Sequence, residues 1–347
     1  MSLGLAQCLI FAQVNRLVDL SPGPRDLVAH GLQFFAARRW RELGHPVPIE
    51  LVAAELQHAF VHHASTSVLA RVCEACDGPL LLVKGPAATQ LYHDPALRPY
   101  QDLDLVVADP RRLQEALLGQ GFTELGEAPY GLHHERPLLA PEVPLVIEVH
   151  GHVKWIRGLE PPPFERLVRD ALPFDGADGV LMLPPAEHAA LLAVHVWAHD
   201  PLTRLLRLID VAVATSASDT DVVARVVREW GLEKLWRRTT RLIDAVIYDS
   251  ARLPAPERFW GRKSRPRARD DRVGGVSGRL LGPLVVLPPG IGARAVLEEI
   301  VWLIRPESGE TARTRVRRIS RHLRDSGSPR TVVHVRDTDE RSTWKET

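Results

Sequence analysis

The stretch from residue 81 to residue 107 constrains the fold most, because it joins a buried-strand pattern to two closely spaced carboxylates. An apolar run ends at a Lys84-Gly85 turn, and farther on Asp102 and Asp104 alternate with leucines. Alternation of this kind predicts a strand, and the period of two places both carboxylates on the same face. Two neighbouring anions are costly unless a cation or water reaches them, so we expect Mg²⁺, basic side chains or open water beside them.

A second acidic position follows in residues 130–150, which read as a hairpin with its turn at Pro141-Glu142. In the second strand of this hairpin, Glu148 and His150 share one face. A glutamate within the apolar run Val-Ile-Glu-Val is expensive to bury without a partner. For the histidine, a buried ring bonded to a backbone carbonyl is the alternative to a place beside the carboxylate.

Length and cysteine content set broad limits. The chain has 347 residues, 45% of them hydrophobic, which suffices for one large or two ordinary domains. Its three cysteines, Cys8, Cys73 and Cys76, cannot build a disulfide framework, so we expect a reducing cytoplasm. No apolar run is long enough to span a membrane, and the apolar N-terminus lacks the basic segment of a signal peptide.

Charge is distributed unevenly along the chain. Residues 251–347 hold 21 Lys and Arg against 12 Asp and Glu, whereas residues 1–250 hold 23 against 31. The basic C-terminal region is either a solvated face or a surface for a polyanion such as RNA. Aromatic residues are sparse there, so a small-molecule or peptide partner is favoured over nucleic acid, and the sequence leaves the oligomeric state open.

Periodicity and proline content divide the chain into five parts. These are an N-terminal helical segment packing on the core (1–78), a core (79–156), a proline-rich connection (157–183), a helical domain (184–250), and a basic, Arg-rich C-terminal region with a partly disordered tail (251–347).

The motif of the core resembles a known family. A Lys-Gly turn, a helix with a tyrosine, and then Arg-Pro-x-x-Asp-x-Asp from Arg98 to Asp104 is similar to the nucleotidyltransferases of the DNA polymerase beta-like superfamily. Within it, the chain resembles the poorly characterised bacterial nucleotidyltransferase family proteins, over residues 79–155. The resemblance implies an α+β fold: a small mixed-sheet core with flanking N-terminal helices and a C-terminal helical domain.

The resemblance also implies roles for particular residues. Asp102, Asp104 and Glu148 would be the catalytic metal ligands for two Mg²⁺ ions, or Mn²⁺, which activate the acceptor and stabilise the leaving pyrophosphate. The nucleotide, an NTP and in the first place ATP, would be bound by Lys84, Gly85 and Arg98. His150, His195 and His199 would stand behind these groups in a second layer.

Several of these positions have a structural alternative. Arg98 would either steady the triphosphate or form a salt bridge, for instance with Asp102. Tyr92 would line the base pocket or be a buried helix tyrosine. His195, His199, Arg204 and Asp210 would face the cleft, or cross-link a helical pair, which is the more frequent case.

Two classes of function follow. The first is an enzyme that moves a nucleoside monophosphate from an NTP onto a hydroxyl or other nucleophile of a small molecule, peptide or protein, or, as a toxin-type variant, onto tRNA. The second is a nucleotide-binding or interaction module without turnover. Pro86 favours the second, because it stands where the superfamily usually has a serine or glycine; the three convergent carboxylates favour the first.

Overall fold

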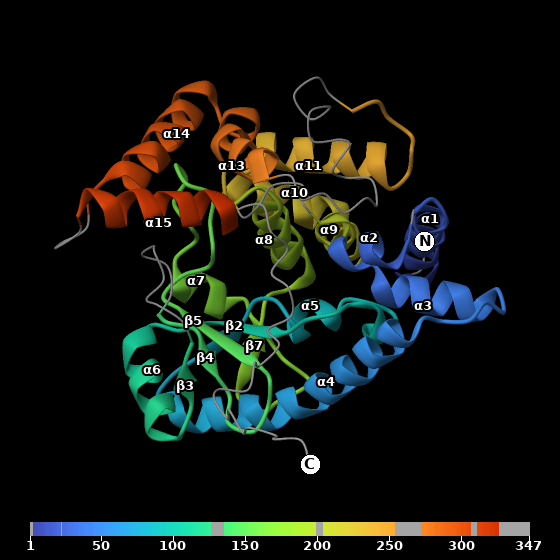
Figure 1. The fold of residues 1–347 in the computed structure, drawn as a ribbon, viewed down its shortest axis with the longest axis horizontal. Helices are drawn as coiled ribbons and strands as arrows, with labels where there is room; N and C mark the ends of the chain where they lie inside the picture. Colours follow the sequence, from blue (N-terminus) through green and yellow to red (C-terminus); the bar gives the residue numbers. More distant parts are fainter. Residues whose placement is uncertain are drawn as a thin grey trace, which may run out of the picture.

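The computed structural model describes residues 3–21, 23–125, 135–198, 204–253, 272–306 and 311–325. A seven-stranded mixed sheet is combined with helices before and after it in the chain, so the predicted α+β class is confirmed. Figure 1 shows the long N-terminal helix α4 running beneath the strands, with the later helices, yellow to red, on the opposite side.

The sheet has the strand order β3-β4-β5-β2-β1-β7-β6. Its strands are β1 (Leu80–Leu82), β2 (Asp102–Val106), β3 (Thr123–Glu124), β4 (Leu138–Leu139), β5 (Val146–His150), β6 (Leu172–Pro173) and β7 (Val180–Met182). β2 and β5 are parallel neighbours near its centre, and β1 lies antiparallel on the other side of β2. Both acid-bearing strands are therefore held by hydrogen-bonded partners along both sides.

The register of β2 and β5 decides which side chains meet. Asp104 is the Cα partner of Glu148, and Val106 is the partner of His150. The residues between them, Leu103 and Leu105 on β2 and Ile147 and Val149 on β5, are fully buried. Because side chains alternate, the apolar set occupies one face of the sheet and the polar set the other.

Helices of the N-terminal segment lie next to the core. They are α1 (Leu3–Asp19), α2 (Pro24–Ala29), α3 (Gln33–Glu42) and α4 (Ile49–Ala75). The predictions of helical structure before residue 79, and of one long helix near residues 48–76, are thus confirmed. Val61, Val68, Leu69 and Val72 of α4 belong to the same buried cluster as the strand leucines.

The remaining helices follow the strands in order. They are α5 (Pro86–Thr89), the 3-10 turn η1 (Pro95–Leu97), α6 (Pro110–Gly119), α7 (Phe164–Arg169), α8 (Pro185–Ala198), α9 (Leu205–Ser216), α10 (Thr220–Glu229), α11 (Glu233–Val246), α13 (Arg272–Val286), α14 (Pro289–Ile304) and α15 (Ala312–Asp325). α8 and α9 form the predicted helical pair, and Trp197 of α8 donates its indole N–H to Thr239 Oγ1 of α11 at 2.8 Å.

Three local predictions meet different outcomes. The helix expected at 87–92 is wrong in length, since α5 ends at Thr89 and only hydrogen-bonded turns continue to Tyr92. The hairpin is confirmed where it is described, because β4 pairs antiparallel with β5; residues 130–134 lie outside the described part. Residues 272–279, expected in a mobile basic loop, begin α13, while 254–271 and 326–347 are not described.

The sheet ends in short strands. β3 and β6 each have two residues, all four of them exposed, and β6 ends in Pro173. Among the helices described, none has the length and apolar character that a bilayer crossing requires.

Candidate metal centre

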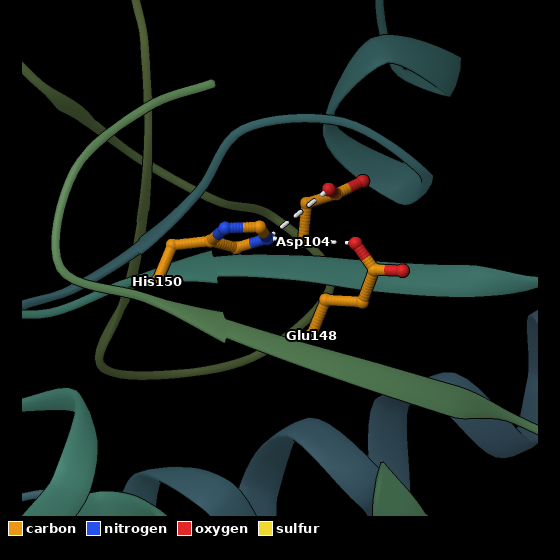
Figure 2. A group of neighbouring side chains, drawn as sticks. All are labelled: Asp104, Glu148 and His150. Atoms are coloured by element: carbon orange, nitrogen blue, oxygen red, sulfur yellow. Dashed lines mark ion pairs between the residues drawn. The ribbon is translucent and has the colours of Figure 1, made fainter. Parts of the chain in front are cut away.

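Three side chains converge on the polar face of β2 and β5. Figure 2 shows Asp104, Glu148 and His150 pointing toward one another above the strands. The imidazole Nε2 of His150 lies 3.4 Å from Asp104 Oδ1 and 3.7 Å from Glu148 Oε2. One ligand atom from each residue falls within 4.8 Å of the others, a spacing that suits a shared cation.

The three side chains are almost wholly removed from solvent. Asp104 is 3% exposed, Glu148 7% and His150 2%. Buried carboxylates side by side are unfavourable unless positive charge compensates them. The local sequence places the carboxylates side by side, because the alternating leucine, isoleucine and valine residues are buried on the opposite face of the two strands.

Lys84 supplies one compensating charge. Its Nζ lies 2.7 Å from Asp104 Oδ1, and the side chain is only 13% exposed. Burial alone would raise the pKa of Asp104, but the attraction of Lys84 and the contact with His150 outweigh burial and hold that pKa well below its usual range. Asp104 is therefore an anion at neutral pH. Lys84, predicted to meet a triphosphate, is here the partner of the carboxylate.

Gly85 makes the turn that presents Lys84. Its φ of 53° and ψ of −121° lie where side chains are rarely found. A Cβ at this position would stand 2.7 Å from the backbone oxygen of Asp102. The glycine thus allows the turn to approach β2 closely, beside the acidic strand.

Arg98 forms a buried salt bridge, with a partner different from Asp102, the one expected. Its Nε and Nη2 donate to the two carboxylate oxygens of Asp210 at 2.8 and 3.0 Å, and its Nη1 donates to the Gly85 carbonyl at 3.1 Å. Tyr92 donates its hydroxyl to Asp210 Oδ1 at 2.6 Å. Burial raises the pKa of Tyr92 well above its ordinary value, and the charge of Asp210 adds to the effect.

Asp102 lies one pleat away from the three converging residues. It is the Cα partner of Val146 and is half-buried, and it is not a member of the 4.8 Å group. Being two residues before Asp104, it faces the same side of the sheet. His150, predicted to stand behind the ligands, is instead a member of the group itself.

The structure places the predicted residues of the helical pair in different surroundings from one another. His195 is half-buried on α8, Arg204 precedes the first residue of α9, and His199 lies outside the described residues. Asp210 is 4% exposed and binds Arg98. The signal for this contact was an aspartate in the apolar sequence Leu-Ile-Asp-Val of a helix; its partner, 112 positions earlier, could not be read from spacing.

The donor set suits a divalent cation. Carboxylate oxygens are the preferred ligands of Mg²⁺ and Mn²⁺, and an imidazole nitrogen is accepted by Mn²⁺ and zinc. Asp104, Glu148 and His150 form the only group of three such donors at ligand spacing in the part of the chain that is described. The site therefore fits a bound metal ion by the chemistry and the spacing of its donor atoms.

Fold and site together define an α+β protein with a buried candidate metal centre on adjacent parallel strands, next to a lysine-glycine turn. Comparison with protein families matches residues 27–247 to the family described as "Uncharacterised nucleotidyltransferase", and the chain belongs to that family. No curated protein and no solved structure matches the chain. The family resemblance inferred from the core motif is thus confirmed, and the match extends well beyond the core on both sides.

Proposed function

We propose that the protein is a divalent-metal-dependent nucleotidyltransferase that transfers a nucleoside monophosphate from an NTP to a nucleophilic acceptor and releases pyrophosphate. Membership of the nucleotidyltransferase family supports the general reaction. The convergence of Asp104, Glu148 and His150 on one polar sheet face is the observation that carries the proposal.

Asp102, Asp104 and Glu148 would be the ligands that hold the metal. The proposal gives His150 a place among them, through its Nε2. A bound Mg²⁺ or Mn²⁺ supplies Lewis acidity for the triphosphate oxygens and lowers the pKa of the acceptor hydroxyl. Asp102, more exposed than the rest, would reach the same cation from the open side of the site.

Lys84 would exchange partners during nucleotide binding. Without a metal its ammonium neutralises Asp104. With a metal ion held by that carboxylate, the Lys84 ammonium would be available to bind triphosphate oxygens as a compact point charge. Gly85 would let the triphosphate approach the backbone, and Arg98 would support the turn from behind through the Gly85 carbonyl.

Glu148 would act on the acceptor. A carboxylate placed beside the reacting hydroxyl can accept its proton as the new phosphate ester bond forms and the bond to pyrophosphate breaks. The acceptor would be a hydroxyl or other nucleophile of a small molecule, peptide or protein, and ATP would be the first NTP to test.

The test is nucleotide turnover in wild type and in Asp104→Asn. Each labelled NTP is incubated with the protein and Mg²⁺ or Mn²⁺, and pyrophosphate release and protein labelling are measured. We expect Asp104→Asn to lower the rate roughly a hundredfold or more, because a metal ligand contributes several kcal/mol to transition-state stabilisation. Glu115→Gln is the matched control, since Glu115 is an exposed carboxylate of α6 that pairs only with Arg111 among the described ion pairs.

The result separates the two classes of function. Turnover that requires Asp104 but not Glu115 supports the enzyme. NTP binding without turnover for any nucleotide, unchanged in Asp104→Asn, would instead indicate a nucleotide-binding module. Labelling of added tRNA, with no labelling of protein or small molecules, would identify the toxin-type variant.

A further inference from the structure

A buried polar network connects the helical domain to the lysine-glycine turn. It consists of Tyr92, Arg98, Asp210 and the backbone carbonyl of Gly85. Arg98 is 7% exposed, and Asp210 and Tyr92 are each 4% exposed. Asp210 comes from α9 and follows Arg98 by 112 residues of chain.

All three nitrogen atoms of the Arg98 guanidinium have partners. Two of them bind Asp210 side by side, and the third donates to the Gly85 carbonyl. A planar guanidinium fixed along one edge by a carboxylate cannot rotate, so its third donor is aimed in one direction. Asp210 thereby determines where the Gly85 carbonyl is held, although it does not touch the turn itself.

The Gly85 carbonyl oxygen accepts hydrogen bonds from Thr89 as well as from Arg98. The donors of Thr89 are its backbone N–H at 3.1 Å and its Oγ1 at 2.9 Å. On its other side, Gly85 lies against the backbone oxygen of Asp102. The turn is thus clamped between Arg98 and β2, and Lys84, the preceding residue, extends from this clamp to Asp104.

The position of the Arg98 charge matters as much as the hydrogen bonds. Arg98 is fully buried, and Asp102 is near enough for its negative charge to favour the protonated guanidinium. A buried arginine without Asp210 would keep its charge, because a guanidinium does not lose its proton in proteins. A guanidinium that turned instead toward Asp102 of β2, the other carboxylate whose charge acts on it, would compete there with a metal ion.

We propose that Asp210 is a positioning residue for the metal centre: by binding two nitrogen atoms of the Arg98 guanidinium, it holds the Lys84-Gly85 turn and keeps the guanidinium away from the Asp102 carboxylate. The proposal rests on the metal-dependent function proposed above and adds a residue of α9 to it. Asp210 itself touches neither the cation nor the nucleotide in this role.

The experiment measures Mn²⁺ binding to the full chain by calorimetry and by the electron paramagnetic resonance of free Mn²⁺, without nucleotide. We expect Asp210→Asn to weaken Mn²⁺ binding roughly tenfold, the order of effect of one misplaced buried charge near a cation. Tyr92→Phe is the matched control: it removes one hydrogen bond to Asp210 but leaves the arginine pair, so its Mn²⁺ affinity should equal that of wild type.

A double variant tests whether the positive charge of an Arg98 without its Asp210 partner weakens metal binding. Arg98→Met combined with Asp210→Asn removes the competing guanidinium together with its hydrogen bond to the Gly85 carbonyl, so Mn²⁺ affinity should recover only part of what Asp210→Asn loses. A merely structural role predicts lower thermal stability for these variants but unchanged Mn²⁺ affinity in the folded protein. Asp210→Glu, which keeps the charge but moves the guanidinium by one methylene, should weaken Mn²⁺ binding severalfold and replaces Asp210→Asn if that variant does not fold.

The outcomes are distinguishable. Wild type that binds Mn²⁺ and transfers nucleotide, with Asp210 variants that bind Mn²⁺ equally well, overturns the positioning role alone. Wild type that binds no Mn²⁺ overturns both the metal-dependent function and this proposal. Weakened binding in Asp210→Asn with partial recovery in the double variant supports it.

Discussion

At position 85 the backbone admits glycine alone. The positive φ disfavours any side chain, and a Cβ would stand 2.7 Å from the Asp102 backbone oxygen. We expect Gly85→Ala to reduce the free energy of unfolding by about 2 kcal/mol or more and to weaken metal binding, because the turn must move away from β2. Chemical denaturation and Mn²⁺ titration measure the two effects.

Gly119 is the comparison for that substitution. It belongs to α6, and a Cβ there would meet nothing within 4 Å. Gly119→Ala should therefore leave stability unchanged or slightly raised. If both alanine variants behaved alike, the close approach of the turn to β2 would not be what position 85 requires.

Lys84 gives a prediction about pH. The pKa of Asp104 is depressed in the folded protein, so its ion pair contributes stability above the pKa of the unfolded carboxyl and loses it as pH falls through the folded value. Lys84→Met should thus be less stable than wild type by about 3 kcal/mol at pH 7, and the difference should shrink as pH falls below about 4.

Urea denaturation in EDTA, repeated at several pH values, measures this difference. Saturating Mg²⁺ should narrow the gap between Lys84→Met and wild type at pH 7, because the cation takes the place of the ammonium. An equal gap with and without Mg²⁺, or a gap that widens in acid, would contradict the assigned ion pair.

At the residue scale, the sequence predicts correctly which face of the sheet a side chain lies on where the strand period alone determines it. The common face of Asp102 and Asp104, and that of Glu148 and His150, follows from strand period. What it missed was the parallel register that pairs Asp104 with Glu148 and brings His150 into the group. Register depends on how the intervening hairpin closes, which a local pattern does not encode.

Among the elements, helix α8 carries a buried acidic residue outside the candidate metal centre. Glu187 is 7% exposed, and burial, reinforced by the nearby charges of Asp170 and Glu229 and opposed by Arg166, raises its pKa to about 7. A carboxyl with a raised pKa binds its proton more tightly in the folded state. Its contribution to stability is therefore present in acid and is lost as pH rises from about 4.5 toward 7.

Glu187→Gln should remove this dependence. The variant should be more stable than wild type by about 2 kcal/mol at pH 8 and nearly equal to it at pH 4.5, as seen in thermal unfolding across that range. Gln57→Ala, a change at an exposed and uncharged residue of α4, should retain the wild-type slope. A pH profile that stays steep in Glu187→Gln would place the titration elsewhere.

Elements were predicted best where the pattern was long. The 27-residue helix α4 and the amphipathic α10 and α11 follow from periodicity. α5 was predicted three residues too long because its residues favour a helix, yet the chain leaves the helix early and places Tyr92 beside Asp210. Such a tertiary contact overrides local preference.

In the whole molecule, the core and the helical domain share buried contacts. Arg98 of the core and Asp210 of α9 share a buried ion pair, and Trp155 after β5 packs edge-on against Trp230 after α10 at 5.7 Å. Breaking such a pair leaves an uncompensated buried charge, which is costly. We therefore expect the amides of β2 and of α9 to exchange with deuterium through the same global opening.

Native-state hydrogen exchange measures that prediction. Equal opening free energies for β2 and α9, both lowered by Asp210→Asn, are the expected result. If α9 opened at much lower free energy while β2 stayed protected, the boundary predicted at residues 157–183 would separate two independently folding domains.

The sequence could not supply this coupling. The proline-rich composition of 157–183 predicted a connection between lobes, and composition alone does not reveal a contact across it. The family match over residues 27–247 covers residues of both parts.

The two ends of the sheet have a consequence for behaviour at high concentration. β3 and β6 offer two residues each, and the last residue of β6 is a proline that has no amide hydrogen to give. Within the described residues, the sheet therefore presents no long unpaired template on which a neighbouring molecule could add a strand. We therefore expect the short edge strands themselves to disfavour fibrous aggregation.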